Sequence, residues 1–211
     1  MKSDFNLFID QFIGVRSLAD SYGVEGVPAA AANAQGFVFD AGDAIHFGNN
    51  RQLNPRMLSK VKFELLINNT ADSDNTVPDG STVFCGLVNA DFNVDPVGDA
   101  GTTKYILFSV GTAGAASGDI HVMASDGVTT YDEVLRQSDS RSREYEIDLA
   151  SGVEDVFCRV GGKPAHSTNG TINLEHITEA DRMQPVVCVV GANVTATLSQ
   201  IEIRGRRSLL K

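Results

Sequence analysis

Short runs of apolar and β-branched residues, separated by Gly, Asn and Asp, recur along most of this 211-residue chain. In Val61–Ile67, apolar and polar residues alternate until the last three positions. Such alternation places one face of a β-strand against a core and the other in solvent. We therefore predict about eleven strands from these runs. Their ranges are 37–39, 44–47, 61–67, 83–88, 105–110, 120–124, 145–149, 156–160, 172–174, 186–190 and 194–203.

No strongly amphipathic helix is predicted between these strands. Parallel strands need a long crossover connection, usually a helix, so antiparallel pairing is expected. Two sheets packed face to face bury the apolar sides of this many strands. A chain of this length forms such a fold as one domain. The predicted fold class is all-β, an antiparallel two-sheet β-sandwich over residues 36–207 with a C-terminal tail of residues 208–211.

The first 35 residues differ in character from the rest. The stretch from Phe5 to Phe12 alternates and predicts either one strand or a docking arm. Residues 23–36 are mostly small and include Pro28, which cannot donate to a strand ladder. We predict that residues 1–35 form an extended N-terminal arm and linker.

The first two strands of the sandwich are predicted to form a hairpin. Phe37–Phe39 and Ala44–Phe47 flank the sequence Asp-Ala-Gly-Asp at positions 40–43, which is typical of a tight turn.

The formal net charge is −10 and the isoelectric point is about 4.7. This field repels phosphate, so neither nucleic acid nor an anionic membrane is expected as a partner. Apolar stretches stay far below the roughly 18 residues that span a bilayer. Asp4, Asn6 and Asp10 interrupt the apolar residues near the start, so no export signal is predicted. We expect a soluble protein.

Three cysteines, Cys85, Cys158 and Cys188, lie in apolar runs and are far apart in the sequence. An odd number cannot pair completely within one chain, and no Cys-x-x-Cys spacing is present. We predict reduced, buried thiols, with neither a zinc site nor a cysteine nucleophile.

An acidic triplet, Glu144, Glu146 and Asp148, shares one face of a predicted strand because side chains two apart point the same way. Paired carboxylates of this kind hydrolyse glycosidic bonds. The glycanase sequence that the triplet resembles, E-I-D-x-x-E, requires an acid where Ser151 stands. The chain also lacks Trp, a common floor for sugar rings. A solvated acidic stripe is the favoured interpretation.

Other candidate ligands are scattered. Acidic loop residues offer oxygen ligands for calcium, but their spacing is not that of an EF-hand, and turn chemistry explains them. The histidines are interpreted as ordinary sheet or loop residues, and no cofactor is predicted. The residues concerned are Asp72, Asp74, Asp91, Asp95, Asp99, His46, His121, His166 and His176.

The segment Arg143–Leu149, followed by Ser151–Pro164, resembles a strand–turn–strand unit of concanavalin-like jelly rolls. The alternating run Ala196–Arg204 is similar to the closing strand of such domains in virion proteins of tailed phages. Over residues 36–207, the order of elements resembles small capsid decoration or cement proteins. The resemblance implies a non-enzymatic virion protein that is made in the host cytoplasm and binds the capsid surface. It also implies a major capsid protein as partner and a homo-oligomer, with a trimer favoured.

Contacts with such partners are expected from apolar residues of the arm and from basic residues near the C-terminus. The alternative for the arm residues is that they complete the domain's own sheet. The candidate interface residues are Phe5, Leu7, Phe8, Phe12, Arg204, Arg206 and Arg207. Two other functions remain open: a lectin-like carbohydrate-binding module, which ranks second, and a glycan-cleaving enzyme.

Overall fold

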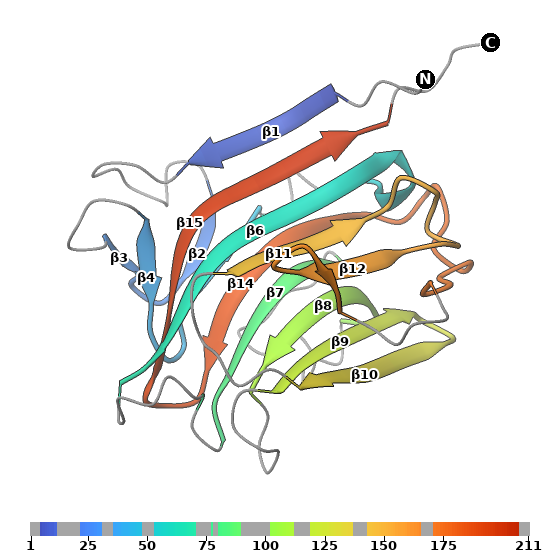
Figure 1. Cartoon of the computed structure of the whole chain (residues 1–211). Coiled ribbons are helices and arrows are strands. Elements are labelled where there is room, and N and C mark those ends of the chain that lie inside the picture. The colour runs from blue at the N-terminus through green and yellow to red at the C-terminus, as the bar shows by residue number, and fades with distance from the viewer. Residues whose placement is uncertain are drawn as a thin grey trace.

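The computed structural model shows two antiparallel β-sheets packed face to face (Figure 1), which confirms the predicted sandwich. The structure describes residues 5–11, 22–30, 36–47, 53–70, 77, 80–89, 102–111, 119–136, 143–165 and 171–206. Within these ranges the only helical element is a 3-10 turn at Pro55–Met57. No helix there is long and apolar enough to cross a membrane.

One sheet has eight strands, in the order β13-β12-β11-β6-β15-β4-β3, with β1 paired to β15 beside that path. Its long central strands β6 and β15 pair over most of their length, and two bulges in that ladder bend them. The strand bounds are β1 Phe5–Gln11, β3 Ala29–Ala30, β4 Phe37–Phe39, β6 Leu58–Asn69, β11 Arg143–Asp148, β12 Phe157–Val160, β13 Lys163–Pro164 and β15 Val194–Gly205.

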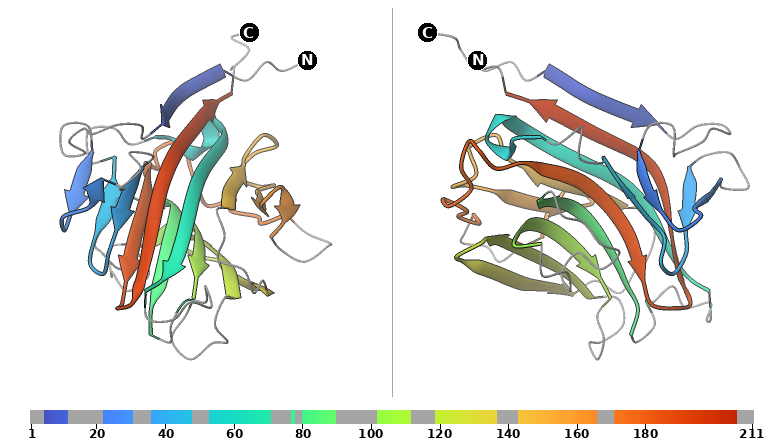
Figure 2. Two further views of the ribbon diagram at one scale, coloured as in Figure 1. Left: turned by 60° about the vertical axis from the view of Figure 1, so that its left-hand side comes forward. Right: turned by 180° about the vertical axis from the view of Figure 1, so that it is seen from behind.

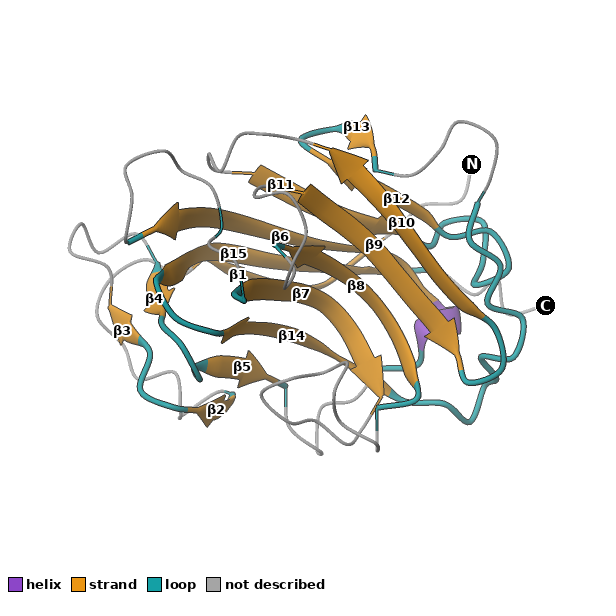
Figure 3. Cartoon of the chain, turned by 90° about the horizontal axis from the view of Figure 1, so that it is seen from below, coloured by secondary structure: helices purple, strands orange, loops and turns teal. Residues whose placement is uncertain are grey.

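The other sheet has seven strands, in the order β10-β9-β8-β7-β14-β5-β2. Figure 3 shows this order from β10 to β2, with the sheet facing the viewer. The strand bounds are β2 Gly23–Glu25, β5 Ala44–His46, β7 Thr82–Asn89, β8 Lys104–Val110, β9 Asp119–Asp126, β10 Thr130–Arg136 and β14 Met183–Val190.

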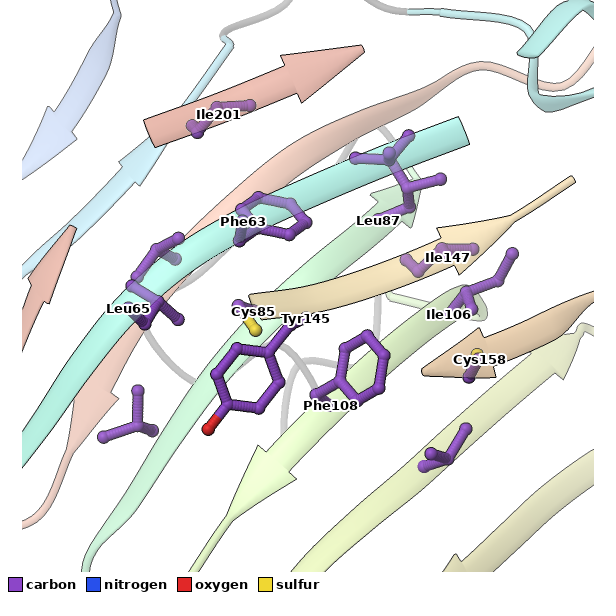
Figure 4. Packing of buried hydrophobic residues seen from close by; sticks show 14 of the residues in the cluster. Phe63, Leu65, Cys85, Leu87, Ile106, Phe108, Tyr145, Ile147, Cys158 and Ile201 are labelled. Atoms are coloured by element: carbon purple, nitrogen blue, oxygen red, sulfur yellow. The ribbon is translucent and has the colours of Figure 1, made fainter. Parts of the chain in front are cut away.

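Side chains from every second position of the strands point inward and form the core between the two sheets. Phe63 from β6, Phe108 from β8 and Tyr145 from β11 are among its largest buried side chains (Figure 4). The rings of Phe108 and Tyr145 meet edge to face at 5.3 Å, a favourable aromatic geometry. The predicted strand faces of β6 and β11 are therefore confirmed.

The seven-stranded sheet is strongly curved. Its strands arch toward the eight-stranded sheet, so that the outer face of the seven-stranded sheet is concave (Figures 1 and 2). This outer face also has an apolar cluster of its own, separate from the main core, which includes Phe84, Leu107 and Val186.

The predicted hairpin at residues 37–47 was wrong. Strand β4 pairs with β15 and β3 in the eight-stranded sheet, whereas β5 pairs with β14 and β2 in the seven-stranded sheet. The turn is tight, since the amide of Asp43 donates to the carbonyl of Asp40 at 2.9 Å. It directs the chain from one layer to the other, because β4 pairs with β15 in one sheet and β5 pairs with β14 in the other.

Two further strand predictions differ from the structure. Residues 172–174 form only an isolated bridge, Ile172 with Val156, and not a strand. Strand β10, Thr130–Arg136, was not predicted. It carries charged residues, as edge strands commonly do, and these hide its alternation.

The predicted arm contains strands that belong to both sheets. Strand β1 pairs antiparallel with β15, in a register that runs from Phe5 opposite Gly205 to Gln11 opposite Gln200. Strands β2 and β3 extend the two sheets at their edges. The described parts of residues 1–35 thus follow the alternative in which this segment completes the domain's own sheets.

Candidate functional site

The concave face presents one row of side chains from four neighbouring strands. Residues directly opposite each other in an antiparallel ladder point to the same face. Phe84 on β7, Ser109 on β8, His121 on β9 and Val134 on β10 are opposite one another in this way. Because Phe84 belongs to the outer apolar cluster, the whole row faces away from the core.

Polar side chains gather in this part of the concave face. His121 Nδ1 lies 2.9 Å from Asp132 Oδ1, across the β9–β10 ladder. The Ser109 side chain lies directly beside His121 in the β8–β9 ladder, and Tyr105 projects from the same face of β8. We call Tyr105, Ser109, His121 and Asp132 the concave polar cluster.

Two atoms of this cluster are buried without a protein hydrogen-bond partner, the Ser109 hydroxyl oxygen and His121 Nε2. Ser109 is completely buried, and the His121 side chain is 13% exposed. Buried polar atoms are nearly always hydrogen-bonded in native proteins, so two adjacent exceptions make this cluster the candidate binding site.

The cluster also perturbs a titratable group. Burial raises the pKa of the Tyr105 hydroxyl, and the negative charge of Asp132 raises it further. Tyr105 therefore stays a neutral hydroxyl, able both to donate and to accept a hydrogen bond. Asp132, whose side chain is 50% exposed, is the acidic residue at the open side of the cluster.

The other half of the concave face is mainly apolar. Val186 and Cys188 on β14, together with Leu107 on β8, are fully buried there. At its far side, His46 Nδ1 lies 3.3 Å from Gln184 Oε1. The side chains of Val186, Cys188 and Leu107 have no exposed surface, whereas Val134 on β10, on the same face beside His121, is 47% exposed.

Glycosidase chemistry needs two carboxylates on one side of the sugar, and on the concave face Asp132 is the acid whose side chain contacts the polar cluster. Asp132 is bonded to His121. Nowhere in the described ranges do three or more His, Cys, Asp or Glu residues gather as metal ligands. Candidate ligands at Asp72, Asp74 and positions 91–99 lie outside the described residues.

The predicted acidic triplet lies on the opposite side of the molecule, on the outer face of the eight-stranded sheet. Glu144 binds Lys62 at 3.1 Å, and Asp148 binds Arg159 at 2.8 Å. Glu146, which is nearly buried, binds both Arg159 and Lys60, at 2.6 and 2.7 Å. All three carboxylates are thus neutralised by cross-strand ion pairs, as suits a structural ladder.

Lys62 and Arg159 are fixed in the charged state by this ladder. Burial alone lowers the pKa of Lys62, but its hydrogen bonds to Glu144 and Glu64 raise it above the ordinary value. The hydrogen bond to Asp148 raises the pKa of Arg159. Neither cation is available as a proton donor near neutral pH.

A buried aspartate holds a loop beside one end of the concave face. Asp126 Oδ1 accepts from the amides of Val128 and Thr129, and its Oδ2 accepts from the amide of His176 and contacts His176 Nδ1 at 2.9 Å. Lys104 binds Asp181 in the same loop at 2.8 Å. These bonds tie residues 176–181 to strands β8 and β9.

The candidate interface residues do not form one group in the described structure. Phe5, Leu7 and Phe8 lie on β1, whereas Phe12 and Arg207 lie outside the described residues. Arg204 Nε donates to Glu202 Oε1 at 2.5 Å, and the amide of Arg206 donates to the carbonyl of Met57 at 2.8 Å. The interface role of these residues stays a prediction.

The cysteine prediction is confirmed: Cys85, Cys158 and Cys188 are all free and buried. Burial raises the pKa of the Cys85 and Cys158 thiols, which keeps both protonated and unreactive.

The concave polar cluster was not found from the sequence. Its members come from three strands, and only the pairing register brings Ser109, His121 and Asp132 together. The sequence did hold one signal: Ser109 and His121 are polar residues within two otherwise apolar strands. Polar residues at such positions are unusual and indicate a candidate site.

No protein-family model matches the sequence, and neither does any curated protein. Among solved structures, the chain is similar to SCLam, an endo-β-1,3(4)-glucanase of family GH16. The TM-score is 0.66 at 9% identity, covering 97% of this chain and 92% of SCLam. It is also similar to the carbohydrate recognition domain of Emp47p. That match has a TM-score of 0.64 at 9% identity and covers 93% and 94% of the two chains.

A third neighbour is the alginate lyase AlyC3, with a TM-score of 0.55 at 12% identity. It covers 84% of this chain and 78% of the lyase. At such identities the likeness is one of fold. The chain has the concanavalin-like jelly-roll fold that these glycosidases and lectin domains share.

Proposed function

We propose that the protein is a carbohydrate-binding module of lectin type, which holds a saccharide on the concave face of its seven-stranded sheet. The observation that carries the proposal is the pair of buried, unpartnered polar atoms, Ser109 Oγ and His121 Nε2, side by side on that face. The neighbours of the same fold, a lectin domain and a glucanase, support this class of ligand.

The chemistry of the face suits a sugar. A saccharide presents hydroxyls, which donate and accept, around a ring whose C–H surface is apolar. Tyr105, Ser109 and His121 supply matching polar groups, and Val134, which is 47% exposed opposite His121, supplies apolar surface beside them. An unpaired buried hydroxyl costs free energy that a ligand hydroxyl recovers.

The same geometry favours binding over catalysis. Ser109, His121 and Asp132 are the residue types of a nucleophilic triad, but no Ser109–His121 hydrogen bond forms. Ser109 also lies in the middle of β8, with paired strands on both sides, so neighbouring amides are used by the ladders. An oxyanion hole requires free amides beside the nucleophile.

A glycan array followed by calorimetry tests the proposal. Ser109→Ala removes a hydroxyl that has no protein partner, so the variant should fold as well as the parent and lose glycan affinity. Leu66→Thr, at an exposed position on the outer face of the other sheet, is the control and should bind as the parent does. A parent that binds no glycan would overturn the proposal.

A second candidate function is a structural subunit that decorates a phage capsid as a homo-oligomer. The observation that favours it is β1, a seven-residue strand at a sheet edge whose described partner is β15. Edge strands of this length can add to a neighbouring chain. Light scattering tests it: a trimer that dissociates when residues 1–11 are deleted supports this candidate, and a parent that is monomeric at high concentration contradicts it.

A further inference from the structure

We infer that the concave polar cluster selects neutral, hydroxyl-rich saccharides and rejects uronic acids, because His121 Nε2 is held as a hydrogen-bond acceptor. The inference rests on the proposed function and adds the class of sugar. It follows from the tautomer of His121, the position of Ser109 and the charges around both.

Asp132 determines the tautomer of His121. An ionised carboxylate has no proton to donate, so the contact of 2.9 Å requires His121 Nδ1 to carry the proton. In a neutral imidazole, Nε2 then has only a lone pair. The group that satisfies this buried nitrogen must therefore be a donor, and a sugar hydroxyl is one.

Ser109 gives the second half of the recognition. Its hydroxyl is completely buried, has no protein partner and lies directly opposite His121 in the β8–β9 ladder. A serine hydroxyl both donates and accepts. A ligand hydroxyl that donates to His121 Nε2 satisfies that nitrogen. The oxygen of the same hydroxyl, or a neighbouring ligand hydroxyl, can form a hydrogen bond with Ser109, so both buried atoms are satisfied.

The charges that face His121 oppose an anion. Asp132 on β10 is negative and contacts His121, and Tyr105 on β8 is a neutral hydroxyl that adds no charge. Lys104, at the end of β8, is engaged with Asp181. Asp119 on β9 and Arg136 on β10 lie opposite each other in the ladder, at positions on the same face as His121. Apart from Arg136 and the histidines, no described strand position on the concave face carries a basic residue.

An array of neutral oligohexoses and oligouronates of matched length, read at pH 7.5 and 150 mM salt, tests the inference. We expect the neutral members to bind at least tenfold more tightly than the uronates. Calorimetry with the best neutral oligosaccharide then compares two variants. The side chain of His121→Asn can still donate to Asp132, but it is too short to reach the place of Nε2. The longer side chain of His121→Gln can offer an oxygen there.

We expect His121→Asn to weaken binding about tenfold and His121→Gln to stay within about threefold of the parent, as the loss of one hydrogen bond implies. Uronates that bind as well as neutral sugars, or a His121→Asn variant that binds as the parent does, would overturn the inference while leaving the proposed function intact. Absence of binding by any oligosaccharide would overturn both.

Discussion

Removing the carboxylate of Asp126 is expected to destabilise the fold in a pH-dependent way. The side chain is 1% exposed and accepts hydrogen bonds from the amides of Val128, Thr129 and His176, besides its contact with the His176 ring. Burial works to raise the pKa of Asp126, but these bonds outweigh it and lower the pKa from 3.8 to about 2. The ionised form is therefore stabilised by folding.

The size of the effect follows from that shift. At 1.36 kcal/mol per pKa unit, a fall from 3.8 to about 2 corresponds to about 2.5 kcal/mol of stability. Because the folded pKa lies below the unfolded one, this contribution is complete above pH 4 or so and is lost as the pH falls toward 2. Asp126→Asn should remove most of it and also flatten the pH dependence over that window.

Urea unfolding followed by circular dichroism, from pH 7 down to pH 2, measures this effect. The control is Asp155→Asn, which neutralises an exposed aspartate whose side chain has no described hydrogen bond. We expect about 2–3 kcal/mol of destabilisation at pH 7 for Asp126→Asn and less than about 0.5 kcal/mol for the control. An Asp126→Asn variant as stable as the parent at pH 7 would refute the reasoning.

Two further predictions concern the seven-stranded sheet and the thiols. Gly86→Ala places a Cβ 2.2 Å from the carbonyl oxygen of Ile106, so thermal unfolding should show a loss of about 1–3 kcal/mol. Gly42 also has a positive φ, of 85°, but nothing lies within 4 Å of the added carbon, so Gly42→Ala carries backbone strain without the clash. It should cost less than Gly86→Ala, and equal losses would contradict the steric explanation. Because burial raises the pKa of Cys85 and Cys158, a thiol reagent at pH 8 should label neither until urea unfolds the chain. Rapid labelling of Cys85 or Cys158 in the native protein would contradict this prediction, because it would show that the reagent reaches the buried thiols.

The fold class was predictable from the sequence because alternation is a local property. In β6 and β11, each core position was read from the apolar residue at every second place, as at Phe63 and Tyr145. Which sheet a strand joins is not local. Phe37–Phe39 and Ala44–His46 are separated by a turn that suits a hairpin, yet their partners lie in β15 and β14, more than a hundred residues away.

The candidate site was not predictable for the same reason. Ser109, His121 and Asp132 are 11 or 12 residues apart in sequence, and a register slip of one residue would turn one of them into the core. The acidic triplet was visible because it lies within one strand. Its ion pairs with Lys60, Lys62 and Arg159 from neighbouring strands then showed a structural role.

Chemical-shift mapping by NMR shows which face of the protein a saccharide contacts. The isotope-labelled protein is titrated with the best neutral oligosaccharide from the array. If the concave face binds the saccharide, we expect saturable shifts of the amides at Ser109, His121 and Asp132 and unchanged signals at Glu144 and Lys62 on the opposite sheet. Shifts confined to that opposite face, or none at saturating oligosaccharide, would contradict binding at the concave face.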